Sequence, residues 1–250
     1  MRLTNNRRPQ AFIAAVAGLL LAGTAVAAPL VVRSTGPSAK AYPVGKAIAA
    51  DAKIVLKAGD TLMLMDGKGT RTINGPGNFS ASGSSVASAG AGSTLAALAA
   101  GGGERKARIG AVRSASGIDK NAGKNPNMWY VDVTKSANVC VASPAAVTVW
   151  RPDSAAAATV NVSGPGGATG TIDLAAGKAD GQWPASVPVT DGGQYQLSWA
   201  GAKAPTALKV QVVSPGSGAP EDLAQSLIQK GCNAQLDMMI AAMAPSTPGG

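Results

Sequence analysis

Short apolar runs of strand length recur along most of the chain, and glycine, proline and aspartate residues separate them. In residues 28–80 these runs are Leu30–Val32, Ala52–Leu56, Leu62–Met65 and Thr70–Ile73. They lack helical periodicity and are flanked by turn residues, which is typical of β-strands. Asp66-Gly67, between the last two runs, predicts a hairpin. We therefore expect residues 28–80 to form a small β domain.

A second set of such runs occupies residues 128–215. The candidate strands are Trp129–Val133, Asn138–Ala142, Val147–Arg151, Thr159–Val162, Gly170–Leu174, Val187–Thr190, Tyr195–Trp199 and Leu208–Val213. Strands at this spacing, with Gly, Pro or Asp in the turns, favour a β-sandwich. The segment Asp191-Gly192-Gly193-Gln194-Tyr195-Gln196-Leu197 resembles the Asp-x-Gly-x-Tyr-x-Cys signature of immunoglobulin-type domains. The resemblance implies that Tyr195 braces a corner, and that Leu197 takes the place of an intersheet cysteine.

The C-terminal residues 220–243 have a helical pattern instead. Pro220-Glu221-Asp222 suits the first turn of a helix, where proline and acids are favoured, and Gly231 breaks the pattern. An apolar stripe follows at helical spacing, consisting of Cys232, Leu236, Met239, Ile240 and Met243. We expect the stripe to pack on the sandwich, with a groove for a partner as the alternative. The predicted fold is mainly β: a small β domain, an immunoglobulin-like sandwich and a C-terminal α-helical segment.

From Ser80 to Gly103 the chain is almost wholly serine, alanine and glycine. Such a composition buries too little apolar surface to offset the entropy lost on ordering. We therefore predict a flexible insertion over residues 81–107, followed by a closing strand of the first domain near residues 108–113.

Residues 1–27 have the pattern of a secretory signal peptide. Arginines precede an apolar run at Phe12–Ala22, and Ala25-Val26-Ala27 offers the small-residue pattern that signal peptidase cleaves. We place the cleavage after Ala27 and the mature protein in the periplasm. A twin-arginine signal and an uncleaved membrane anchor are the alternatives. Cleavage lowers the formal net charge from +9 to +6, because the segment contains three arginines and no acid.

The only two cysteines, Cys140 and Cys232, both remain in the mature chain. An even number in an oxidising compartment predicts one disulfide, which would join the sandwich to the C-terminal helices. Two reduced thiols are the alternative.

The sequence excludes several kinds of catalytic site. It has no histidine, so Ser-His-Asp, Cys-His and histidine-bearing zinc sites cannot form. It also lacks a Ser-x-x-Lys motif, the spaced aspartates of a calcium loop and the Gly-Lys-Ser/Thr end of a phosphate loop. We expect a non-enzymatic protein without cofactor or metal. Its positive charges are scattered, which argues against nucleic acid and allows weak association with anionic envelope polymers.

All four tryptophans lie in the second domain: Trp129, Trp150, Trp183 and Trp199. Trp150 and Trp199 fall in apolar alternations and are predicted to be core residues. Trp129 and Trp183 lie at strand edges, where an aromatic ring can serve as a platform for a ligand. They support an alternative function, the binding or hydrolysis of peptidoglycan or polysaccharide, for which paired aspartates could meet in space.

One pattern in the first domain consists of Leu56–Asp60, Leu62–Asp66, Gly69, Gly75-Pro76-Gly77 and Phe79, with Ile109–Arg113 further on. It resembles the FecR-type domain of bacterial envelope proteins. The resemblance implies a periplasmic β module that works in envelope signal transduction through protein contacts. The best-known type spans the inner membrane and binds a sigma factor through an N-terminal cytoplasmic helix. This chain is expected to depart from that type, because its signal is predicted to be cleaved and no other span is predicted, so an envelope or inner-membrane partner is implied. We expect an accessory or sensor-binding component whose candidate interface includes Gly75, Pro76, Gly77, Trp129 and Trp183.

Overall fold

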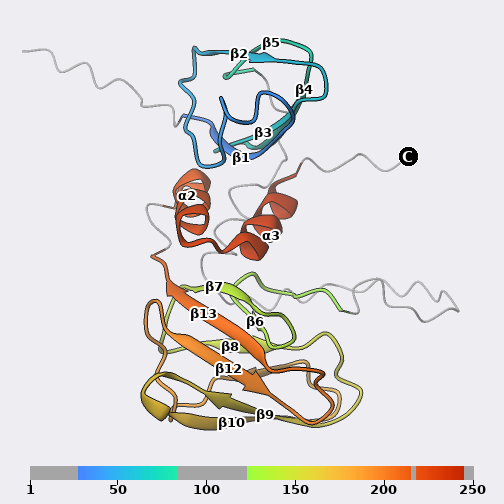
Figure 1. Cartoon of the computed structure of the whole chain (residues 1–250), viewed down its shortest axis with the longest axis vertical. Helices are drawn as coiled ribbons and strands as arrows, with labels where there is room; N and C mark the ends of the chain where they lie inside the picture. The colour runs from blue at the N-terminus through green and yellow to red at the C-terminus, as the bar shows by residue number, and fades with distance from the viewer. Residues whose placement is uncertain (1–27, 84–122, 215–217, 245–250) are drawn as a thin grey trace, which may run out of the picture.

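The computed structural model describes residues 28–83, 123–214 and 218–244. The predicted signal peptide and closing strand, and the insertion from residue 84 onward, lie outside the described residues. Figure 1 shows two β units with a pair of helices between them. The molecule is mainly β, as the sequence predicts.

The N-terminal β unit contains two small sheets. Its strands are β1 (Leu30–Thr35), β2 (Lys53–Leu56), β3 (Thr61–Asp66), β4 (Gly69–Asn74) and β5 (Gly77–Ser80). One sheet has the antiparallel order β1-β3-β4, and β2 pairs with β5 in the other. Asp66 is the partner of Gly69, which confirms the predicted hairpin. Leu62 and Leu64 are buried on one face of β3, and Met65 on the other face is buried as well.

The second unit is a β-sandwich. Its elements are β6 (Val131–Asp132), β7 (Ala137–Val141), β8 (Thr148–Trp150), β9 (Ala158–Ser163), a 3₁₀ turn (Pro165–Gly167), β10 (Thr169–Leu174), β11 (Asp180–Gln182), β12 (Gln194–Ser198) and β13 (Thr206–Val212). One sheet has the order β10-β9-β12-β13-β7 and the other β11-β8-β6. Apolar side chains of both sheets share one buried core. The sheets approach closely at Gly181, where an added Cβ would lie 2.6 Å from Leu174 Cδ2.

One strand prediction in this unit was wrong. Val187–Thr190 forms no strand, and Pro188 within it lacks the N–H that a ladder needs. Two strands were not predicted: β11 in this unit and β5 in the N-terminal unit. Their sequences, Asp180-Gly181-Gln182 and Gly77-Asn78-Phe79-Ser80, contain too few apolar residues to show alternation. Backbone pairing with β8 and β2 decides their conformation.

The predicted brace by Tyr195 is confirmed. Its ring is buried, and its hydroxyl donates to Pro188 O at 2.9 Å and accepts from the Thr190 N–H at 2.9 Å. Gly193 of the same motif leaves room for this hydroxyl, because a Cβ there would lie 2.6 Å from it. The motif therefore ties the loop before β12 to that strand, as in the corner of immunoglobulin-type sandwiches.

We expect Tyr195→Phe to lower the free energy of unfolding by about 2 kcal/mol, because two backbone groups lose their partner while the ring stays in place. Urea denaturation measures the loss. Tyr130→Phe is the matched control, since no hydrogen bond joins the Tyr130 hydroxyl to the described residues. Equal stability of the two variants would show that the hydroxyl of Tyr195 contributes nothing.

The C-terminal segment forms α2 (Pro220–Lys230) and α3 (Asn233–Met243). The prediction of two helices broken at Gly231 is confirmed. Gly231 adopts φ +72°, and its N–H donates to the carbonyl of Ile228 at 3.1 Å. A left-handed residue that returns its N–H to the last turn is a common helix ending, and glycine adopts it without a steric penalty.

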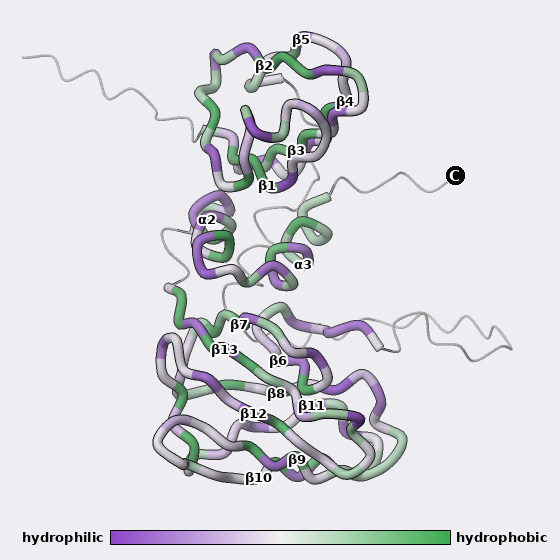
Figure 2. The backbone as a smooth tube through the Cα atoms, in the orientation of Figure 1, coloured by the Kyte–Doolittle hydropathy of each residue, from purple (hydrophilic) through white to green (hydrophobic). Residues whose placement is uncertain are grey.

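The helices lie between the two β units (Figure 1). Their buried apolar residues form one cluster with three from the N-terminal unit, Leu30, Val32 and Met65, and four from the sandwich, Met128, Trp129, Cys140 and Val213. The second half of α3 is coloured as hydrophobic in Figure 2. The predicted packing of the stripe on the sandwich is present but is only part of the contact. The stripe also covers the N-terminal unit, because α2 and α3 expose apolar side chains toward both units.

Candidate functional site

A shallow hollow on the sandwich contains one of the predicted site residues, and we call it the Trp183 pocket. Its volume is about 430 Å³, and its lining consists of Pro144, Ala145, Val147, Gln182, Trp183, Pro184, Ala185, Val187, Pro188 and Val189. The residues come from the loop between β7 and β8, from the last residue of β11 and from the loop between β11 and β12. None of these lining side chains is charged. The size is in the range of small-ligand sites, and the lining suits apolar or neutral contacts.

Local hydrogen bonds fix the Trp183 ring. Its backbone N–H donates to Val147 O at 2.9 Å, and its indole Nε1–H donates to Val187 O at 2.7 Å. The ring meets Tyr195 edge to face, with centroids 5.3 Å apart and an interplanar angle of 88°. Such aromatic pairs are favourable beyond their buried area. The half-buried indole is therefore held rigidly in the wall of the pocket by these hydrogen bonds and by its contact with the buried Tyr195 ring.

Trp129 does not belong to the surface. Its side chain is only 7% exposed and packs in the core that the helices share with both β units. The expectation of a ligand platform at Trp129 is therefore wrong: the chain turns this ring inward beneath α3. Of the two tryptophans predicted as candidates, Trp183 alone lines a hollow at the surface.

Gly75-Pro76-Gly77 forms the connection from β4 to β5 in the N-terminal unit, and its Gly75–Pro76 peptide bond is cis. Gly75 packs against the preceding turn: its N–H donates to Asp60 O at 2.9 Å, and an added Cβ would lie 2.1 Å from Lys57 O. The connection is therefore fixed by close packing. It lies in a different unit from the Trp183 pocket, and the two candidate surfaces do not meet.

Asp60 holds that turn together. Its carboxylate accepts the N–H groups of Ser38, at 2.8 Å, and Lys57, and the residue is 2% exposed. Burial alone raises the pKa of Asp60, but the hydrogen bonds from Ser38 and Lys57 and the Lys57 charge outweigh it and lower the pKa below its ordinary value. Its role is structural: an ionised carboxylate that binds backbone donors.

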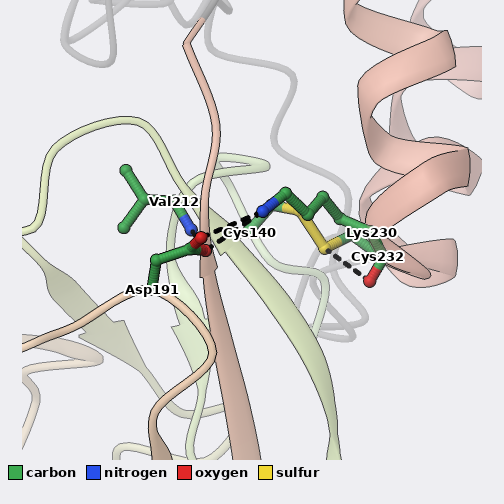
Figure 3. A network of polar contacts seen from close by, with 5 residues as sticks. All are labelled: Cys140, Asp191, Val212, Lys230 and Cys232. Carbon is green, nitrogen blue, oxygen red and sulfur yellow. Dashed lines mark hydrogen bonds and ion pairs between the residues drawn. A yellow bond between two sulfur atoms is a disulfide. The ribbon is translucent and has the colours of Figure 1, made fainter.

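A second cluster of polar contacts joins the sandwich to the helices (Figure 3). The predicted disulfide between Cys140 of β7 and Cys232 at the start of α3 is present. Beside it, the Asp191 carboxylate accepts a hydrogen bond from the Val212 N–H at 2.8 Å and forms an ion pair with Lys230 at 3.1 Å. The Val212 N–H and Lys230 together lower the pKa of Asp191. We call this region, formed by Cys140, Cys232, Asp191 and Lys230, the joint, and we assign it a structural role.

Gln235 of α3 is a joint residue that the sequence interpretation missed. Its Oε1 accepts the Cys140 N–H at 2.7 Å, and its Nε2 donates to Met128 O at 2.9 Å and to Cys140 O. The residue is 5% exposed. A signal for it existed, because Gln235 lies one turn after Cys232, among the apolar residues of the stripe, where a polar side chain needs a buried partner.

A smaller hollow of about 250 Å³ lies on the sandwich beside Arg151 and Trp199. The Arg151 side chain donates to the carbonyl groups of Leu174, Ala175 and Lys178 and is 7% exposed. These bonds tie the β10–β11 connection to β8, so we assign Arg151 a structural role.

Within residues 28–83, 123–214 and 218–244, no group of three His, Cys, Asp or Glu side chains is placed to hold a metal ion. None of the helices in these ranges is long and apolar enough to cross a membrane. Comparisons with protein-family models, with curated proteins and with solved structures find no match. The geometry of the Trp183 pocket is therefore the basis for a proposed function.

Proposed function

We propose that this chain is a periplasmic, non-enzymatic binding protein that acts through protein contacts as an accessory or sensor component of an envelope signalling system. The observation that carries the proposal is the Trp183 pocket, a rigid and uncharged recess on the surface of a β-sandwich. An apolar recess with a fixed aromatic ring suits an apolar side chain of a protein partner, because such anchors contribute much of the affinity of protein interfaces.

The disulfide supports the proposed compartment. The Cys140–Cys232 disulfide indicates an oxidising environment, since reducing compartments keep such thiols free. The signal-peptide pattern of residues 1–27 supports export with cleavage after Ala27. The resemblance of residues 28–80 to FecR-type domains supports envelope signalling and an envelope or inner-membrane protein as the partner.

The decisive test is capture of partners from an envelope extract by the mature protein and by two charge-matched variants. Ala185→Glu puts a carboxylate into the Trp183 pocket at an exposed position, and Ala200→Glu puts one at an exposed position of the smaller hollow. We expect Ala185→Glu to reduce the retained partner at least tenfold, because a buried, unpaired charge at an interface costs about 2 kcal/mol or more. Ala200→Glu should retain it. Equal retention by both variants would remove the pocket from the proposal.

Polysaccharide binding remains the second candidate, because the half-buried Trp183 indole lies in the wall of the pocket, where a sugar ring could stack. Pelleting with purified peptidoglycan distinguishes the two. If Ala185→Glu abolishes pelleting and no envelope protein is captured, polysaccharide binding replaces the signalling proposal. If pelleting is absent and a membrane protein is captured, the polysaccharide candidate fails.

A further inference from the structure

An acidic side chain is buried where the N-terminal β unit meets the helices. Glu221, in the first turn of α2, is 8% exposed. It faces the β3–β4 hairpin, since a side chain at Gly67 would begin 3.8 Å from Glu221 Oε1. Gln225 lies one turn further along the same face of α2, and a side chain at Gly45 would begin 3.7 Å from its amide. This face of α2 therefore packs on the N-terminal unit.

The contact between α2 and the N-terminal unit contains three buried hydrogen-bond acceptors without a donor among the described residues. Both carboxylate oxygens of Glu221 and the Oε1 of Gln225 are buried without a hydrogen-bond partner among the described residues. Buried polar atoms are rarely left unpaired, because each costs free energy relative to its hydrated state. One proton on Glu221 changes this balance, because it removes the buried charge and turns one acceptor into an O–H donor. Gln225 Oε1, one turn further along the same face of α2, is a buried acceptor without a partner among the described residues.

The charged groups that act on Glu221 oppose its ionisation. Burial raises the pKa of this carboxyl above its ordinary value, and the negative charges of Asp66 in the hairpin and Asp222 in α2 raise it further. The backbone N–H groups of Glu221 and Gly67 lie near the carboxylate without hydrogen-bond geometry. Together with the positive end of the helix dipole they lower its pKa, but by less than burial and the two acids raise it. Lys68, in the hairpin turn, is exposed to solvent.

We propose that the contact between α2 and the β3–β4 hairpin is a proton-sensitive latch: protonated Glu221 holds the N-terminal unit on the helices, and ionised Glu221 loosens it. A carboxyl that binds its proton more tightly in the closed contact than in the open one stabilises closure at low pH. The stabilisation is complete below the ordinary pKa of glutamate and is lost as the pH rises through the raised value. This inference does not depend on what the Trp183 pocket binds.

Hydrogen exchange of the mature protein tests the latch. Protection factors of the β4 amides Gly69–Asn74, corrected for the intrinsic pH dependence of exchange, are measured from pH 4 to pH 8 in the wild type, E221Q and D222N. In the wild type we expect protection to fall on the order of tenfold as the pH rises, since each pH unit across the titration changes the open population by up to about tenfold. E221Q, a neutral isostere, should keep high protection at every pH.

D222N removes the same charge from an exposed neighbour and leaves Glu221 in place. It should retain the pH dependence, with the midpoint moved to lower pH, because the Asp222 charge helps to raise the pKa of Glu221. The latch is overturned if E221Q shows the wild-type pH dependence, or if wild-type protection rises with pH. It is also overturned if Ca²⁺ or Mg²⁺ raises protection in the wild type and not in E221Q, because the unpaired oxygens would then hold a cation. If E221Q does not fold, the direction of the wild-type pH dependence alone decides.

Discussion

Replacing both cysteines, in C140A/C232A, is expected to lower the free energy of unfolding by about 4–5 kcal/mol. The disulfide closes a loop of 92 residues, and cross-linking a loop of this length removes much of the conformational entropy of the unfolded chain. Both residues are 0% exposed and lie within the core shared by the two β units and the helices. Loss of the bond therefore also removes a covalent tie between β7 and α3.

Urea denaturation of the oxidised protein, with and without reductant, measures this effect. Reductant should shift the wild-type midpoint close to that of C140A/C232A and leave the double variant unchanged. The double variant also serves as the control for any effect of reductant on the rest of the molecule. Equal midpoints for wild type and double variant in the absence of reductant would contradict the prediction.

The second large effect is expected at Gln235. Gln235→Ala should lower the free energy of unfolding by about 3–5 kcal/mol, because the N–H and carbonyl groups of Cys140 and the carbonyl of Met128 all lose their partner in a buried setting. Gln229→Ala is the matched control, since Gln229 is exposed on α2 and alanine favours helix. It should leave stability within about 0.5 kcal/mol of the wild type.

The two changes share Cys140, so their effects are not expected to add. If Gln235→Ala is no more destabilising than Gln229→Ala, the three hydrogen bonds contribute no net stability. If Gln235→Ala loses less stability in the C140A/C232A background than in the wild type, the disulfide and the Gln235 hydrogen bonds act as one joint.

Local pattern was sufficient to predict most of the strands. Leu62–Met65 is an apolar run between turn residues, and Tyr195–Trp199 contains part of the immunoglobulin-type motif. The structure places strands at both. The hairpin at Asp66 and the break at Gly231 also follow from short-range rules. The disulfide could be predicted because the chain has only two cysteines. The polar strand β11 could not be predicted in this way, because its conformation depends on pairing with β8, a partner distant in the sequence.

The candidate site was predictable only in part. Trp183 and Trp129 carry the same local signal, an aromatic residue at the edge of a predicted strand. The structure places Trp183 in a surface pocket. Trp129 is buried instead, in a core that includes helices about a hundred residues later in the chain. Glu221 carries a good helix-start pattern that gives no hint of its burial, which arises from the distant hairpin.

The position of α2 and α3 has a consequence for how the molecule matures. These helices follow both β units in the chain, yet they complete the core beneath Leu30, Val32 and Met65 of the first unit. During synthesis from the N-terminus, we expect both β units to have an apolar face exposed to water until residues 218–244 are added. Cys232 also emerges after the sandwich that contains Cys140. We therefore expect the thiol pair to be oxidised late in biogenesis, and an unfinished chain to expose apolar surfaces of the kind that chaperones bind.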